Sequence, residues 1–478
     1  MAMTQPQSSY LSATEADVSV MLSRMGLSSV SELFSEIPAS LRAGDNMPFP
    51  PALDEYRLDR EMKALADRNR STGSHPCFLG AGAYDHFIPY AVGQLAGRSE
   101  FLTAYTPYQP EMSQGMLQAI FEYQTQVAAL YGMDGANASL YDGATALTEA
   151  ALLVLRATGR DRVLVSRAVH PMARQVLAST LRHARVRLEE LPMYPATGRV
   201  DRGALQAALA SGDGGPVAGV LLQSPNVLGV VEEVRAVSDL AHAAGALCVV
   251  SADPVSMGVL AAPGALGADV CVGDGQPLGL PLSFGGPGLG LMAVRTPLIR
   301  QMPGRIVGLT KDADGRRGYV LTLQAREQHI RRERAASNIC TNQALCALTA
   351  TIHLALLGPE GLRTVAQACV DHSVYLYRRL IALGLAEPVC DAPFFREFAV
   401  RPVLPPAEMN RILSEAGMVG GLDLSQWLPE TTSPDGRAAW LLAVTEKRTR
   451  EEMDRFCETL LADNAVAGAL SGKGGRDA

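Results

Sequence analysis

The feature that most limits the fold of this chain is a regular alternation of short aliphatic runs with helical segments between residues 163 and 294. The runs are rich in Val and Leu, and the stretches between them, such as ALQAALASG and VSDLAHAAG, carry apolar residues at helical spacing. Strands that alternate with helices indicate βαβ crossovers and a mainly parallel sheet covered on both faces. We therefore expect strands at Val163–Val169, Val186–Leu191, Val217–Gln223, Leu247–Ser251, Asp269–Val272 and Leu289–Val294.

The segments around this alternation divide the chain into three expected parts. Residues 1–60 are predicted to form an N-terminal helical segment, because Thr14 can cap a helix and a Pro-rich stretch follows near residues 46–54. Residues 61–350 are predicted to form the large α/β domain, with a long helix or a helix pair over residues 319–356. Residues 351–478 are predicted to form a smaller α+β domain with a disordered tail, SGKGGRDA.

The charge and cysteine content exclude several classes of function. The chain has 42 basic and 49 acidic residues, a net charge of −7, which argues against a nucleic-acid partner. No apolar run has the length that a membrane span needs, and the N-terminus lacks the pattern of a secretory signal. The 8 cysteines form no CxxC pair, so neither a metal site nor a disulfide framework is expected. A cytoplasmic location is the natural expectation.

Lysines are rare in this chain. The only ones are Lys63, Lys311, Lys447 and Lys473, although arginines are plentiful. Any mechanism that needs a nucleophilic lysine must therefore use one of these four residues.

Polar residues follow several of the expected strands or open the expected helices, which is where sheets of this kind bind ligands. In LYDGATALTEA, the turn before Thr145 could bind a phosphate at a helix N-terminus, or Asp142 or Thr145 could simply cap that helix. Asp253 could hold a protonated ring nitrogen of a cofactor, or it could bind N–H groups of its own loop. His170 could stack on a planar cofactor or serve only the loop.

Other motifs carry weaker signals. His86 and His329 are interpreted as structural residues, and GGPGLG is not a dinucleotide loop, because it opens no βαβ unit and contains a proline. The loop YTPYQPEMSQG is polar and rigid, so it could reach a site. The Arg-rich stretch QAREQHIRRERAASNICTNQ contains interleaved glutamates, which favour a solvated or interface helix over a nucleic-acid surface.

Several of these segments together resemble the glycine decarboxylase P-protein family, and the resemblance runs from about residue 10 to about residue 460. Within that family the chain is similar to the alpha-subunit type of the two-subunit form. The motifs that carry the resemblance are YTPYQPEMSQG, ANASLYDGATALTEA, VSRAVHP, QSPNVLGVVE, GQPLGLPLSFGGPGLG and IVGLTKDADGRRGYVLTLQAREQHIRRERAASNICTNQAL.

The resemblance implies the aminotransferase-like fold of pyridoxal phosphate enzymes (fold type I) and a role in glycine cleavage. The family decarboxylates glycine and passes the aminomethyl group to the lipoyl arm of H-protein. Its catalytic half carries a Schiff-base lysine in a loop resembling HKTFxxPHGGGGPG. Alignment on the shared GGPG places Gln276 at the lysine position, and an amide is not a nucleophilic amine.

The resemblance therefore implies a degenerate cofactor site, formed by Thr145, His170, Asp253 and Gln276, and a lysine-bearing beta subunit that holds pyridoxal phosphate covalently. The expected partners are this beta subunit, in a heterotetramer, lipoylated H-protein and glycine. Residues expected to reach the partner's site from this chain are Tyr105, Tyr108, Gln109, Thr341 and Asn342.

Two other interpretations remain open from the sequence. The chain could be a self-sufficient homodimeric pyridoxal phosphate enzyme that uses Lys311. It could also be a non-catalytic scaffold of the glycine cleavage complex.

Overall fold

The computed structural model describes residues 12–42, 50–104, 106–211 and 214–473, and its contacts divide the chain into two compact units, Met1–Arg70 and Ser71–Ala478. The first unit contains α1 (Glu15–Met25), two short 3-10 helices (Val30–Phe34 and Ala39–Leu41) and α2 (Glu55–Ala66). Thr14 forms a capping box with Asp17 at the start of α1, as its sequence predicts. Among the described residues of this unit, Leu22 is the one buried apolar side chain.

The second unit is built on a seven-stranded sheet with the order β1-β7-β6-β5-β4-β2-β3. Adjacent strands from β6 through β5, β4 and β2 to β3 are parallel, which confirms the predicted sheet. The last predicted strand, β7, instead runs antiparallel to β6, because a loop rather than a crossover helix joins them. The strands are β1 (Gly135–Ala136), β2 (Arg162–Ser166), β3 (Arg187–Leu191), β4 (Val217–Ser224), β5 (Leu247–Ala252), β6 (Val270–Asp274) and β7 (Gly290–Val294).

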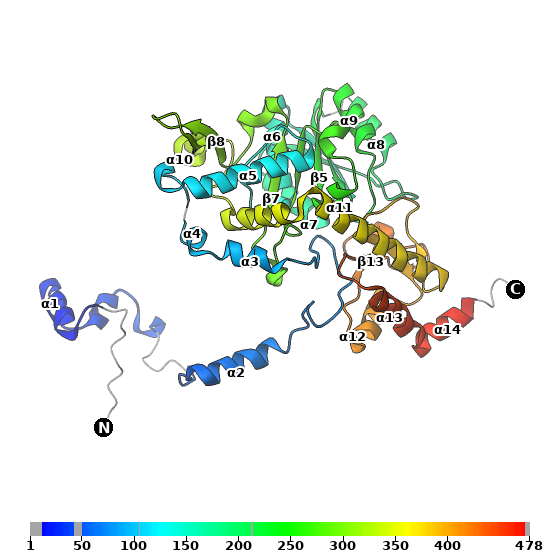
Figure 1. Cartoon of the computed structure of the whole chain (residues 1–478), viewed down its shortest axis with the longest axis horizontal. Helices are drawn as coiled ribbons and strands as arrows, with labels where there is room; N and C mark the ends of the chain where they lie inside the picture. The colour runs from blue at the N-terminus through cyan, green and yellow to red at the C-terminus, as the bar shows by residue number, and fades with distance from the viewer. Residues whose placement is uncertain (1–11, 43–49, 105, 212–213, 474–478) are drawn as a thin grey trace. The chain divides into compact units, whose positions relative to one another are not determined.

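Helices cover both faces of this sheet. Val220 and Leu222 of β4 belong to one apolar cluster, and their neighbour Leu221 belongs to the other, as the twofold alternation of a strand requires. Figure 1 shows α5 and α11 running alongside each other over the first face, where they pack together. The helices of the first face are α5 (Gln114–Tyr131), α8 (Arg202–Ala210), α9 (Val234–Ala243) and α11 (Ala344–Ala382), and those of the second are α6 (Gly143–Thr158) and α7 (Pro171–Leu181).

The C-terminal part is a smaller α+β arrangement, as predicted. Its sheet has the order β10-β11-β13-β12 and packs Trp440 and Phe398 into a third apolar cluster with Phe456. The tail is helical as far as Lys473, which corrects its prediction as disordered, and residues 474–478 lie outside the described residues. The elements are β10 (Ala386–Pro388), β11 (Glu397–Pro402), α12 (Pro406–Glu415), β12 (Leu422–Asp423), β13 (Trp440–Ala443), α13 (Arg450–Leu461) and α14 (Asn464–Lys473).

Of the long helix or helix pair predicted over residues 319–356, the first part, YVLTLQAREQHIRRERA, is wrong. The stretch begins as β9 (Arg317–Thr322), which pairs with β8 (Ile306–Lys311) in a hairpin, and continues through short helical turns that include α10 (Gln328–Arg331). Aromatic and β-branched residues in YVLTL and a Gly-containing turn favour the hairpin over a helix, and Tyr319 and Leu321 are buried on one face of β9. The long helix α11 begins only at Ala344 and is interrupted at Gly358, whose φ of 60° fits a glycine.

Among the described residues, α11 is long and apolar enough to cross a membrane by length and composition alone, which the sequence analysis did not anticipate. The core helix of a soluble protein passes the same test. Cys346, Ala347 and Ala350 of α11 are buried in the apolar cluster beneath the sheet, so packing within the chain accounts for part of this apolar character.

Candidate functional site

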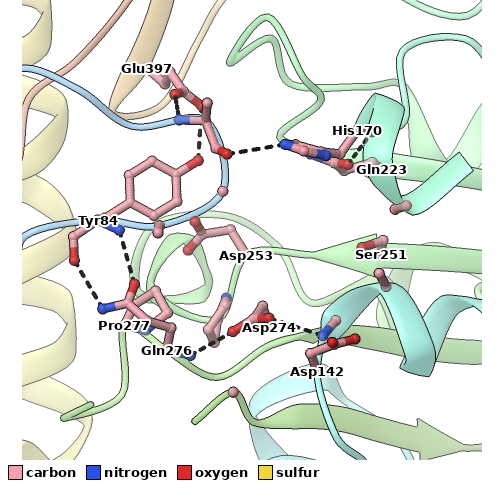
Figure 2. Close-up of a pocket in the computed structure, with 18 of the residues that line it drawn as sticks. Tyr84, Asp142, His170, Gln223, Ser251, Asp253, Asp274, Gln276, Pro277 and Glu397 are labelled. Atoms are coloured by element: carbon pink, nitrogen blue, oxygen red, sulfur yellow. Dashed lines mark hydrogen bonds between the residues drawn. The ribbon is translucent and has the colours of Figure 1, made fainter. Parts of the chain in front are cut away.

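A cavity of about 400 Å³ lies at the carboxyl ends of β4, β5 and β6 (Figure 2). Strand ends, the N-terminus of α6 and a loop around Tyr84 line it, together with Arg396 and Glu397 from the start of β11. This is the edge of a parallel sheet where ligands bind in folds of this kind, and the volume suits a small molecule. Three of the four predicted cofactor-site residues, His170, Asp253 and Gln276, line the cavity.

Asp253 has two sets of partners. Its Oδ1 accepts hydrogen bonds from the backbone N–H groups of Val255 at 2.9 Å and Ser256 at 3.1 Å. Its Oδ2 pairs with the guanidinium of Arg396, a residue only 1% exposed. Asp253 therefore binds the N–H groups of its own loop through Oδ1. Its Oδ2, which a protonated ring nitrogen would need, faces the permanent cation of Arg396 instead.

Two carboxylates occupy the N-terminus of α6. Asp142 accepts a hydrogen bond from the backbone N–H of Thr145 at 2.7 Å, and Asp274 accepts one from the N–H of Gly143 at 2.9 Å. A side chain at Gly143 would place its Cβ 2.9 Å from the Cβ of Asp274, so this glycine permits the close approach. Asp142 therefore caps α6 by accepting the N–H group of Thr145. The backbone N–H groups that would bind a phosphate here already have carboxylate partners.

Gln276 is fixed by three hydrogen bonds from its side chain. Its Oε1 accepts from the backbone N–H of Tyr84 at 2.9 Å, and its Nε2 donates to the carbonyl oxygens of Tyr84 at 3.1 Å and Leu280 at 2.9 Å. No lysine lines the cavity among the described residues. Lys311 is exposed at the end of β8, and Lys447 pairs with Asp85 at 2.7 Å.

Glu397 and His170 hold the loop that covers the cavity. Glu397 accepts hydrogen bonds from the backbone N–H of Ala81 at 2.6 Å and from the Tyr84 hydroxyl at 2.9 Å, and burial raises its pKa to about 7. The Nε2 of His170 donates to the carbonyl oxygen of Ala81 at 3.0 Å, and burial lowers the pKa of this imidazole. The ring of His170 also contacts the ring of Trp427 edge-on, with 5.1 Å between the two ring centroids. The hydrogen bond to Ala81 and this ring contact fix the position of His170 beside the loop.

These contacts test whether the cavity fits pyridoxal phosphate. Asp253, the residue predicted to bind the ring nitrogen, is paired with a guanidinium. The helix N-terminus predicted to bind the phosphate holds two carboxylates. Gln276 offers an amide where the cofactor would need an amine. The residues present do not fit the cofactor. Four lining residues were not predicted from the sequence: Tyr84, Asp274, Arg396 and Glu397. Only Asp274 had a signal, since it follows the predicted strand Asp269–Val272 by two residues and precedes Gln276 by two.

A second cluster contains three of the five residues predicted to reach the partner's site. The guanidinium of Arg305 donates to the hydroxyls of Tyr108 and Thr341, both at 3.0 Å, and to the Oδ1 of Asn342 at 3.1 Å. Arg305 is 4% exposed, and no carboxylate pairs with it among the described residues. We call Arg305, Tyr108, Thr341 and Asn342 the Arg305 cluster.

The other two predicted residues are not part of the Arg305 cluster. Gln109 is exposed on the same loop as Tyr108, and its side chain makes no contact with Arg305. Tyr105 lies outside the described residues. No residue of the Arg305 cluster lines the cavity, so the predicted shared-site residues and the predicted cofactor-site residues form two separate groups. Arg305 itself carried no sequence signal.

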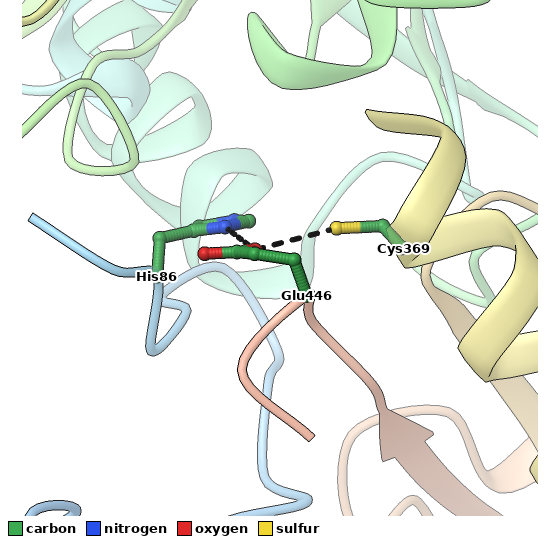
Figure 3. Close-up of side chains that lie close together, drawn as sticks. All are labelled: His86, Cys369 and Glu446. Carbon is green, nitrogen blue, oxygen red and sulfur yellow. Dashed lines mark hydrogen bonds and ion pairs between the residues drawn. The ribbon is translucent and has the colours of Figure 1, made fainter. Parts of the chain in front are cut away.

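His86, Cys369 and Glu446 form a third group, with potential metal-ligand atoms within 4.8 Å of one another (Figure 3). His86 Nδ1 lies 2.6 Å from Glu446 Oε2, while Arg396 donates to His86 Nε2 at 2.5 Å. If Nδ1 bound a metal, the proton of the neutral imidazole would move to Nε2 and face the Arg396 donor. The group therefore fits a hydrogen-bond chain from Asp253 through Arg396 and His86 to Glu446 better than a metal site.

A mainly parallel sheet with helices on both faces and a cavity at the carboxyl ends of its strands is the architecture of fold type I pyridoxal phosphate enzymes, and no lysine lines this cavity among the described residues. In comparisons with known proteins, the family model of the glycine cleavage system P-protein matches residues 8–460. The chain is 52% identical over 445 residues to a probable glycine dehydrogenase (decarboxylating) subunit 1 of Moorella thermoacetica, covering 93% of this chain and 97% of the relative.

Solved structures agree with the sequence relatives. The crystal structure of an inhibitor-bound glycine decarboxylase (P-protein) of the glycine cleavage system is similar with a TM-score of 0.82 and 44% identity, covering 94% of this chain and 98% of that one. A sphingosine-1-phosphate lyase of Burkholderia pseudomallei shares the fold with a TM-score of 0.63 at 17% identity, covering 91% and 94%.

The chain belongs to the glycine cleavage system P-protein family. This confirms the resemblance found in the sequence, the predicted fold class, and the predicted function as subunit 1 of a glycine dehydrogenase (decarboxylating). The name subunit 1 also implies a second subunit.

Proposed function

We propose that this chain is the non-lysine alpha subunit of a cytoplasmic, two-subunit glycine decarboxylase, and that it completes the active site of a lysine-bearing beta subunit. In this assembly the beta subunit binds pyridoxal phosphate covalently, glycine is decarboxylated, and lipoylated H-protein accepts the aminomethyl group. The observation that carries the proposal is Gln276, which the alignment on GGPG puts at the lysine position and whose side-chain amide makes three hydrogen bonds. This side chain can form no Schiff base.

The Arg305 cluster is the part of this chain that we assign to the partner's site. Among the described residues its guanidinium is bound by neutral oxygens alone, those of Tyr108, Thr341, Asn342 and the Cys340 carbonyl, so none of these contacts cancels its charge. Tyr108 and Thr341 are exposed, so the cluster reaches the surface. An uncompensated guanidinium with adjacent hydroxyls suits a carboxylate or a phosphate, the anionic groups of glycine and of the cofactor.

An apolar surface around α3 (Tyr90–Ala96) is the face that we assign to the beta subunit. Tyr90 is 89% exposed, and Phe87 and Leu95 are exposed beside it. The helix α3 packs against α11, on which Leu345 and Leu356 are also exposed. A group of large exposed apolar side chains on neighbouring elements indicates a protein interface, and permanent assemblies bury roughly 2,000 Å² or more.

The Arg305 cluster gives the experiment that tests the proposal. Tyr108→Phe removes one hydroxyl that binds a charged group, and such a hydrogen bond contributes about 1.5–3 kcal/mol. If the cluster contacts glycine or the cofactor across the interface, glycine decarboxylation by the assembled enzyme should fall roughly tenfold or more in Tyr108→Phe and in Thr341→Val. Tyr194→Phe is the matched control, because it makes the same change at an exposed tyrosine outside the Arg305 cluster and outside the cavity.

Assembly is measured beside activity, by sedimentation of each variant with the beta subunit. A loss of activity with intact assembly supports a shared site and excludes a mere scaffold. Full activity in Tyr108→Phe, Thr341→Val and Arg305→Gln alike would show that the cluster only packs the interface.

A further inference from the structure

The cavity of this chain is still open, although its cofactor contacts have been replaced. Its volume of about 400 Å³ lies in the range of small-molecule sites, and its lining combines apolar side chains with a few polar groups. The question is which kind of ligand such a lining can bind.

The charges that line the cavity are mostly negative. Asp142, Asp253, Asp274 and Glu397 contribute carboxyl groups, and Arg396 is the one permanent cation among the described lining residues. Arg396 is paired with Asp253, so it balances one of these carboxylates and leaves the others. The pocket therefore disfavours anions, including phosphates.

Two of the unbalanced carboxylates lie at the same end of the cavity. Asp142 Oδ1 and Asp274 Oδ2 accept backbone N–H groups at the start of α6, Asp274 Oδ1 accepts the N–H of Gln276 at 2.9 Å, and each side chain remains partly accessible. No hydrogen bond involves the second oxygen of Asp142 among the described residues. Burial raises the pKa of Asp274, and the charges of Asp142 and Asp253 raise it further, so a bound cation would relieve this repulsion.

We propose that this cavity is a binding site for a small organic cation, and that Asp142 and Asp274 are the carboxylates that bind its ammonium group. The body of the ligand would lie against the apolar side chains of the lining, such as Met172, Pro281 and Leu282. The inference concerns the chain's own cavity and is independent of the role proposed for the Arg305 cluster.

The test uses the full chain assembled with its beta subunit and a probe that cannot form a Schiff base with the partner's cofactor. N,N-dimethylbenzylammonium is such a probe, since a tertiary amine has no nitrogen hydrogens to lose in imine formation. Isothermal titration compares it with phenylacetate, an anion of similar size, with benzyl alcohol, a neutral analogue, and with inorganic phosphate. We expect saturable binding of the cation, one per copy of this chain, and at least tenfold weaker binding of the other three probes.

Two variants locate the binding. Asp274→Asn keeps the shape of the side chain but removes its charge, and should weaken cation binding about tenfold or more. Asp239→Asn makes the same change at an exposed position on α9 and should leave binding unchanged. Absence of cation binding to the wild-type assembly would overturn the proposal without use of any variant. Equal binding of phenylacetate or phosphate, or unchanged cation binding by Asp274→Asn, would overturn it as well.

Discussion

Replacing Asp253 with asparagine should destabilise the chain strongly, because it removes the counter-charge of a buried guanidinium. The Arg396 side chain is 2% exposed and that of Asp253 is 14% exposed. In Asp253→Asn, the amide oxygen can still accept the N–H groups of Val255 and Ser256. The amide nitrogen would then face the guanidinium, so two donors would meet where an ion pair now lies.

The size of the effect follows from this burial. Removing one partner of a buried ion pair costs about 3–5 kcal/mol, because the other charge stays buried without compensation. Asp253 lines the cavity and keeps some access to water, so we expect a value near the lower end, about 3 kcal/mol. Arg396→Met should cost less than Asp253→Asn, because the carboxylate that remains can be hydrated from the cavity.

The assay is a double-mutant cycle read by thermal unfolding of the assembled enzyme. The single variants, Asp253→Asn and Arg396→Met, are compared with the double variant at equal protein concentration. The double variant removes both charges, so it should unfold at a higher temperature than Asp253→Asn alone. A destabilisation of Asp253→Asn below about 1 kcal/mol, or a double variant less stable than both single ones, would show that Arg396 does not depend on Asp253.

Three further predictions concern the same cavity. Burial raises the pKa of Glu397 to about 7 from an ordinary 4.5, so the folded state binds more protons than the unfolded state between these pH values. The stability of the folded state should therefore fall as pH rises from about 4.5 to 7. Glu397→Gln, which resembles the protonated form, should lack this loss of stability in urea unfolding at pH 5, 6, 7 and 8. Borohydride treatment of the chain with pyridoxal phosphate should leave no pyridoxyl-lysine adduct, and Gln276→Lys should not restore glycine decarboxylation by the chain alone. A stoichiometric adduct on the wild-type chain, detected by mass spectrometry, would contradict the role proposed here as a subunit without a Schiff-base lysine. Gly143→Ala should lower the unfolding temperature while Gly468→Ala, at a helical glycine of α14 with open space around it, should not, because only the first new methyl group would lie 2.9 Å from the Cβ of Asp274.

The sequence was sufficient for the sheet and for the place of the cavity, because both depend on local patterns. Aliphatic runs such as VAGVLLQ mark buried parallel strands, and residues at their carboxyl ends fall at one edge. The first strand was predicted three residues too long, since Arg167 to Val169 already form the turn that leads to α7. The helix predicted for YVLTLQAREQHIRRERA failed because the charged residues that follow YVLTL favour a helix, whereas YVLTL itself forms most of β9.

The contacts that decide the chemistry of the cavity join residues far apart in the chain. Asp253 and Arg396 are separated by 143 positions, and Ala81 and Glu397 by 316 positions. No periodicity connects such residues, so the sequence could suggest that Asp253 faces a ligand but not that an arginine already occupies it. Arg305 was missed for the same reason, although three of the residues predicted to reach the partner's site lie around it.

The contacts of Gln276, Asp142 and Asp274 also give the reason why we expect a lysine at position 276 to be insufficient for catalysis. A lysine there would lose the three hydrogen bonds of the amide to Tyr84 and Leu280, and its flexible ammonium would be free to approach Asp274. Nearby carboxylates favour the protonated form of an amine and raise its pKa, whereas a Schiff base requires the neutral form. The aldehyde would also need a phosphate position that Asp142 and Asp274 now fill with negative charge. The absence of a lysine at position 276 and the carboxylates of Asp142 and Asp274 therefore both disfavour binding of the cofactor. We expect that both features must change before this chain could hold it.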